Sequence, residues 1–192
     1  MRAAATDLRS SLLAAAVAAV LGAIAAAGSV DPYQIAASAF LAAAMGAIAV
    51  EDVRRMRVPD AWNLTAAVGG FVAVGLEAQS SGAPPLVALG HALVSLIVCG
   101  GIFFLIREIF FRLRGVEGLG FGDVKLAATG GIWLGWQIFP AVVLLAAIAA
   151  IFWIAVAALI QRAWPRERKI PFAAFLAPAI WFCWLYARMA QG

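Results

Sequence analysis

The sequence predicts an all-α, polytopic membrane protein. Of its 192 residues, 65% are hydrophobic and only 12% are charged, and the mean hydropathy is +0.98. A soluble domain contains about 45–50% apolar residues, so this composition is typical of a chain that lies in lipid. The apolar residues form successive long runs with short charged stretches between them. No linker, repeat or low-complexity segment interrupts this pattern, so we interpret residues 1–192 as one transmembrane domain.

A helix needs about 20 apolar residues to cross a hydrocarbon core of ~30 Å, and about seven segments qualify on this basis. They are approximately 11–28, 33–50, 61–77, 86–106, 124–136, 138–160 and 171–188. The fifth is short and glycine-rich, so a merger with the sixth, giving six helices, is the alternative. Gly135 and Pro140 favour a turn between the two. The first segment has the basic flank of a signal peptide, but many comparable segments follow, and we interpret it as a retained helix.

The basic residues alternate from loop to loop, which predicts the topology. All but one of the 14 lysines and arginines fall at the N-terminus or in every second connection, and only Arg188 falls on the other side. The positive-inside rule then places the N-terminus and all the basic loops in the cytoplasm. This distribution also explains the pI of about 9.7 without nucleic-acid binding, which we do not expect. The basic loops are expected to contact lipid head groups as well.

The sequence offers few groups for metal or nucleophilic chemistry. Cys99 and Cys183 both lie within apolar segments and do not form a Cys-x-x-Cys pair, and His91 is the single histidine. A thiolate zinc site, a histidine-based metal site and a Ser-His-Asp triad are therefore not supported. We expect no metal and no cofactor.

Two acids lie at the ends of predicted membrane segments. Asp52 follows the second segment, and Asp123 opens the fifth, so the predicted topology puts both at the cytoplasmic face. They would meet if those two helices pack together. Two carboxylates that share one proton can act as base and acid on a bound water without a metal. The pair therefore indicates a candidate aspartyl protease.

Each acid also has a simpler interpretation. Asp123 would serve as the N-cap of its helix, and Asp52 would balance the charges of neighbouring arginines. Glu51 competes for any role given to Asp52. Gly120 and Gly122, just before Asp123, would permit an unusual turn and allow a substrate backbone to approach the acid.

The two acidic stretches together resemble the signature motifs of type IV prepilin peptidases, a family of intramembrane aspartyl proteases. The first motif is an Asp, five residues, an aliphatic residue, Pro, and Asp or Asn, matched by Asp52, Val58, Pro59 and Asp60. The second is Gly-x-Gly-Asp followed by Lys-Leu, matched by Gly120, Gly122, Asp123, Lys125 and Leu126. A third matching stretch covers residues 169–176, and the resemblance extends over roughly residues 40–190.

The resemblance implies that Asp52 and Asp123 are the catalytic pair and that the remaining motif residues support them. The implied substrates are prepilin or pseudopilin precursors, whose short basic leader would be removed after a Gly at the cytoplasmic face of the bacterial inner membrane. Larger family members carry a cytoplasmic domain, often with paired Cys-x-x-Cys motifs, and also methylate the new N-terminus. The sequence lacks that domain, so we expect a short form with peptidase activity and assign no N-methyltransferase activity. Such a form fits Flp-type pili or protein secretion.

Two other interpretations remain at this stage. One is another Gly-x-Gly-Asp protease, of preflagellin or presenilin type, against which Pro59 and the 169–176 stretch argue. The other is a non-catalytic assembly subunit or a transporter. Transporters more typically place their acids near the middle of the membrane, whereas these acids lie at helix ends. The sequence predicts neither the oligomeric state nor the particular pilin.

Overall fold

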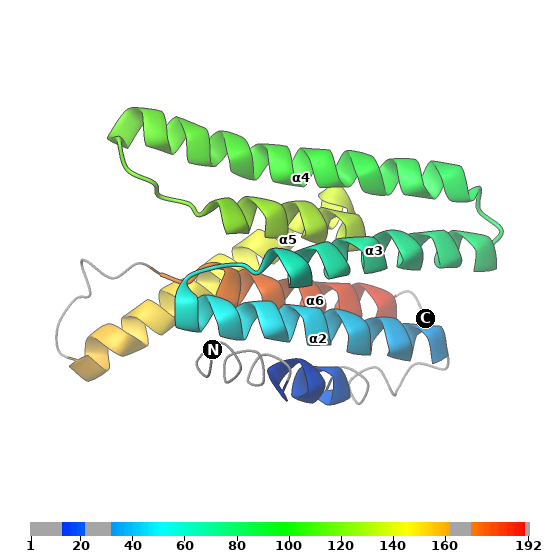
Figure 1. The fold of residues 1–192 in the computed structure, drawn as a ribbon, viewed down its shortest axis with the longest axis horizontal. Helices are drawn as coiled ribbons and strands as arrows, with labels where there is room; N and C mark the ends of the chain where they lie inside the picture. The colour runs from blue at the N-terminus through cyan, green and yellow to red at the C-terminus, as the bar shows by residue number, and fades with distance from the viewer. Residues whose placement is uncertain (1–12, 22–31, 162–169, 191–192) are drawn as a thin grey trace, which may run out of the picture.

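The computed structural model describes residues 13–21, 32–161 and 170–190, and these residues are helical with short connections and no strand (Figure 1). Residues 13–21 form a short helix. The five longer helices are α2 (Pro32–Arg55), α3 (Asp60–Ser80), α4 (Pro85–Arg114), α5 (Phe121–Gln161) and α6 (Ala173–Met189). Of the first predicted segment, 11–28, the structure describes residues 13–21; its basic flank and most of the basic loop between α5 and α6 lie outside the described residues.

Four of these helices, α2 to α5, are long and apolar enough to cross a membrane, and α6 is a shorter apolar helix. Large apolar side chains cover the outer surface, such as Leu86 at 83% exposure and Phe152 at 70%. A lipid-facing surface accounts for such exposure. The structure thus supports a polytopic helical membrane protein. The count of seven spans and the cytoplasmic N-terminus stay predictions.

Two helices extend beyond the predicted apolar segments into charged sequence. The predicted segment 33–50 lies in a helix that ends at Arg55, and the predicted segment 86–106 lies in one that ends at Arg114. Ion pairs four residues apart, Glu51 with Arg55 and Glu108 with Arg112, accompany both extensions. Such pairs stabilise a helix end that has no apolar face to bury. Asp52 therefore lies inside the last turn of α2, rather than just past its end.

The predicted fifth and sixth segments together form α5, whose helical backbone is broken at Gly135. The backbone there has φ 77° and ψ 155°, a conformation that only glycine adopts readily. Figure 1 shows the yellow second part of α5 running back toward the end at which α5 begins. The expected turn is therefore present, and Gly135 produces it.

The first part of α5 lies at the centre of the bundle. α5 packs against α3, α4 and α6, while α2 packs mainly against α3 and α6. The largest fully buried side chains come from α2, α5 and α6 and include Leu41, Met45 and Ile48 of α2, Leu126, Thr129 and Val142 of α5, and Leu176 and Ile180 of α6. This core fixes the helices whose ends carry the two acids.

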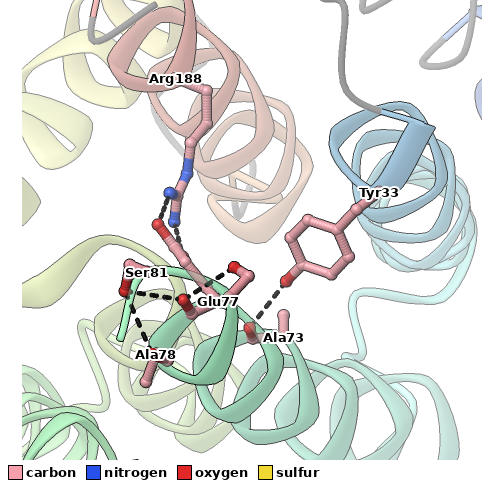
Figure 2. A network of polar contacts seen from close by, with 7 residues as sticks. Tyr33, Ala73, Glu77, Ala78, Ser81 and Arg188 are labelled. Atoms are coloured by element: carbon pink, nitrogen blue, oxygen red, sulfur yellow. Dashed lines mark hydrogen bonds and ion pairs between the residues drawn. The ribbon is translucent and has the colours of Figure 1, made fainter. Parts of the chain in front are cut away.

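The helix ends sort into two groups. α2 and α4 end, and α3, α5 and α6 begin, at the left end of the view in Figure 1. At the opposite end, Figure 2 shows α3 tied to two neighbours. Tyr33 of α2 donates a hydrogen bond to the carbonyl of Ala73 at 2.7 Å, and Arg188 of α6 pairs with Glu77. Arg188 therefore lies away from the acids, as the charge pattern predicted.

Candidate active site

Asp52 and Asp123 line one cavity of about 340 Å³. Both side chains are buried, with exposures of 6% and 9%. They lie close enough to interact electrostatically. The two acids come from helices that do not form a major contact with each other, so they meet across a cavity between helix ends rather than at a helix–helix interface. This arrangement brings together two acids that are far apart in the sequence.

The carboxylate of Asp52 is held by the start of α6. Its Oδ2 atom accepts a hydrogen bond from the backbone N–H of Ala174 at 3.0 Å. The first N–H groups of a helix have no partner within the helix and carry a partial positive charge. They therefore stabilise the ionised form of Asp52. This contact gives a physical reason for the third matching stretch of the sequence, which ends in the first turn of α6.

Asp123 interacts with the turn that precedes its own helix. Its N–H donates to the carbonyl of Gly120 at 3.1 Å, and its Oδ2 accepts from the N–H of Gly120 at 3.2 Å. Because α5 begins at Phe121, Asp123 is the third residue of the helix and reaches back to the residue before it, as in a capping box. The simpler interpretation needs correction: Asp123 does not occupy the N-cap position, although its side chain does cap the helix.

The glycines of the second motif have close neighbours. A Cβ added to Gly122 would lie 2.8 Å from Cγ2 of Val58, and one added to Gly120 would lie 3.2 Å from Oδ2 of Asp123. A side chain at position 122 would therefore displace the segment that follows α2. The glycines permit close packing within the protein, a role that the sequence interpretation did not include.

The supporting residues of the first motif lie at the start of α3. Pro59 is the N-cap residue in an extended conformation and does not line the cavity. Asp60 lines the cavity, and its Oδ1 accepts from Nζ of Lys125 at 2.7 Å. Glu51, the competitor of Asp52, pairs with Arg55 at 3.2 Å and does not line the cavity. The geometry therefore favours Asp52 over Glu51.

Three cavity residues were not singled out by the sequence: Met56, Arg57 and Phe121. Arg57 belongs to the basic loops, whose expected roles are to set the topology and to contact lipid head groups. Met56 has φ 53°, a left-handed conformation that is strained for a residue with a side chain. Nothing in the local sequence signals this strain, because glycine is the usual residue there. Strained residues often cluster at active sites.

Among the described residues, no three His, Cys, Asp or Glu side chains lie together as a potential metal site. The expectation of a metal-free site therefore stays a prediction. What the cavity offers is two carboxylates, each within reach of N–H groups at the start of a helix. This donor set suits the activation of a bound water by acid–base chemistry.

A family model for the type IV leader peptidase family matches residues 39–155, which include both acids and both motifs. The chain belongs to this family. Several curated relatives have the name prepilin leader peptidase/N-methyltransferase. The one from Aeromonas hydrophila is 32% identical over 135 residues, which is 70% of this chain and 44% of the relative. The one from Burkholderia pseudomallei strain K96243 is 33% identical over 172 residues, or 89% of this chain and 50% of the relative.

The Escherichia coli K12 relative is 31% identical over 115 residues, or 60% of this chain and 48% of that protein. The chain thus spans about half the length, or less, of the curated relatives it matches. No solved structure gives a significant match.

Proposed function

We propose that this family member is an aspartyl endopeptidase that removes the short basic leader of prepilin or pseudopilin precursors. The observation that carries the proposal is the single cavity that both motif acids line. Family membership supports the substrate class, because the curated relatives are named as prepilin leader peptidases. The predicted topology supports a cytoplasmic-face site in the bacterial inner membrane.

In this mechanism the two carboxylates share one proton. The ionised acid accepts a proton from a bound water, whose oxygen attacks the scissile carbonyl carbon. The protonated acid donates its proton to the carbonyl oxygen. The C–N bond of the resulting tetrahedral intermediate then breaks, and the amine leaves with a proton returned from the dyad. Cleavage after the Gly of the leader would release the leader and leave the hydrophobic segment in the membrane.

We give Asp52 the role of the base because its carboxylate lies against the N-terminus of α6. The backbone N–H of Ala174 stabilises a carboxylate more than a neutral carboxylic acid. Asp123 also accepts one N–H, but through the longer 3.2 Å contact. We therefore assign the first proton transfer from water to Asp52 and the donating role to Asp123.

The direct test is co-expression with a prepilin substrate, with leader removal followed on a gel. We expect Asp52→Asn and Asp123→Asn each to abolish processing while the protein still accumulates in the membrane. The matched control is Glu51→Gln, next to Asp52 but outside the cavity, which should process normally. Normal cleavage by either Asp variant would refute the dyad. Loss of cleavage in Glu51→Gln alone would identify Glu51, rather than Asp52, as the first acid.

A second test concerns metal. Because two carboxylates and a water suffice for this chemistry, purified protein should retain full activity in EDTA. Strong inhibition by EDTA that added Zn²⁺ or Mg²⁺ reverses would contradict a metal-free dyad.

A further inference from the structure

Two contacts join the segment that follows Asp52 to the turn that carries Asp123. Lys125 donates to the carboxylate of Asp60 at 2.7 Å, across 65 residues of sequence. Val58 lies directly against Gly122, because a Cβ on that glycine would meet its side chain at 2.8 Å. Both contacts join the segment that follows α2 to the start of α5, and neither involves an atom of Asp52 or Asp123.

We propose that the Asp60–Lys125 ion pair is a latch that sets the separation of Asp52 and Asp123. In this view Asp60 and Lys125 are positioning residues that act through the backbone and take no part in proton transfer. The proposal deepens the proposed function of the same site and rests on it. It also explains the spacing of both motifs, because Asp60 and Lys125 must each lie a fixed number of residues from an acid.

The latch is the outermost of three side-chain hydrogen bonds between the described residues of α3 and α5. Asn63 accepts a hydrogen bond from Thr129 at 3.1 Å, and the carbonyl of Ala66 accepts one from Trp133 at 2.9 Å. The partners on α3, which are Asp60, Asn63 and Ala66, are spaced three residues apart. Those on α5, which are Lys125, Thr129 and Trp133, are spaced four apart. The two sets therefore lie on facing sides of the two helices. The two inner contacts fix the register of α3 on α5. The Asp60–Lys125 pair holds the starts of α3 and α5 together beside the cavity.

The outer contact reaches Asp52 through α3, one of the two helices against which α2 mainly packs. The short segment between α2 and α3 contains Val58 and connects Asp52 to Asp60. If the start of α3 moves away from α5, that segment carries the end of α2 with it. A displacement of about 1 Å at reacting groups can cost on the order of a hundredfold in rate.

Lys125 has a second conceivable role, as a positive charge that acts directly on the two acids. The contacts argue for the latch instead. The ammonium group is bound to Asp60 and lies 5.2 Å from the ring centre of Phe121. The side chains of Lys125 and Asp60 are 38% and 77% exposed, and an exposed ion pair contributes little to folding stability. Variants of either residue should therefore fold.

Steady-state kinetics on Asp60→Ala, Lys125→Met and the double variant separate these roles. The latch predicts that each single change lowers kcat by roughly tenfold or more, with KM changed by less than about twofold. The double variant should fall no further, because both changes remove one interaction. The charge swap Asp60→Lys with Lys125→Asp should restore part of the activity. Additive losses, or a loss of activity in Lys125→Met with Asp60→Ala silent, would overturn the latch.

The matched control is another exposed pair near the same end of the molecule. Arg112 and Glu108 of α4 are joined at 2.8 Å and do not line the cavity. Glu108→Gln and Arg112→Met should retain wild-type kcat. An equal loss in these variants would show that the effect is a general result of lost surface charge, which would refute the latch.

A cross-linking measurement tests the latch without proteolysis. Cysteines at positions 52 and 123, with Cys99 and Cys183 changed to alanine, report whether the two positions remain close. A short bifunctional thiol reagent should join them several-fold faster with Asp60 intact than in the Asp60→Ala background. An unchanged rate would refute the latch whatever the protein cleaves. Conversely, a wild-type protein that cleaves no prepilin would refute the proposed function and leave the cross-linking result standing.

Discussion

The side chain of Asp52 accepts a hydrogen bond from the backbone N–H of Ala174, which lies 122 residues later in the chain. This contact ties the end of α2 to the start of α6. It gives one acid of the cavity a fixed orientation and a local positive potential. The two acids therefore differ in their surroundings, although each lies at a helix end.

Removing this N–H tests its contribution. Ala174→Pro deletes the donor, together with its weaker 3.2 Å hydrogen bond to the carbonyl of Pro171, within the first turn of α6, where a helix tolerates proline. A hydrogen bond to a charged group contributes about 1.5–3 kcal/mol, which corresponds to roughly a 10- to 100-fold loss in kcat/KM. Peptide cleavage by purified protein measures this loss. Ala174→Gly keeps the N–H and should remain close to wild type; equal losses in both variants would indicate a packing effect instead.

The contact between Gly122 and Val58 predicts a defect that a second change repairs. A Cβ at position 122 would lie 2.8 Å from Cγ2 and 2.9 Å from Cβ of Val58, so Gly122→Ala must displace the segment after α2. We expect prepilin processing to fall by roughly tenfold or more, and Val58→Gly, which removes both atoms, to restore part of it.

The control for this pair is Gly101→Ala on α4, because a Cβ there would meet nothing within 4 Å. It should process prepilin normally. If Gly122→Ala is also normal, or if Val58→Gly fails to rescue it, steric contact between the two motif segments is not what constrains Gly122.

The buried pair of Thr129 and Asn63 predicts a loss of stability. Thr129→Val removes the hydroxyl donor and leaves the buried amide oxygen of Asn63 without its partner. An unsatisfied buried polar group costs about 1–3 kcal/mol, so the thermal unfolding midpoint in detergent should fall by several degrees. Thr65→Val serves as the control, because that exposed hydroxyl bonds only to its own helix. Equal midpoints for the two variants would contradict a stabilising role of the buried pair.

The apolar pattern predicted the helical regions well but not their ends. Residues 86–106 were expected as a helix, and α4 continues through the charged residues to Arg114. Hydropathy reports which residues prefer lipid, whereas a helix end is set by backbone hydrogen bonds and by capping. Gly115, with φ 68°, provides that cap by accepting the left-handed conformation.

The site was predicted in part. The motif acids and Lys125 were identified from the sequence, while their hydrogen-bond partners were not. Ala174 contributes a backbone N–H, which any residue except proline would supply, so its identity carries no signal. The identity of Met56 likewise carries no signal, because its left-handed conformation arises from the path of the chain rather than from its side chain.

The sequence by itself determined that the chain is a helical membrane protein and that two acids lie at helix ends predicted to share one face of the membrane. Apolarity and charge are local properties, so they can be interpreted without knowing which helices touch. The tertiary structure decided that Asp52 and Asp123 line one cavity, and that Ala174, Val58 and Asp60 hold its parts together. These contacts join residues up to 122 positions apart, and only the packing of α2, α3, α5 and α6 brings such residues within hydrogen-bonding distance.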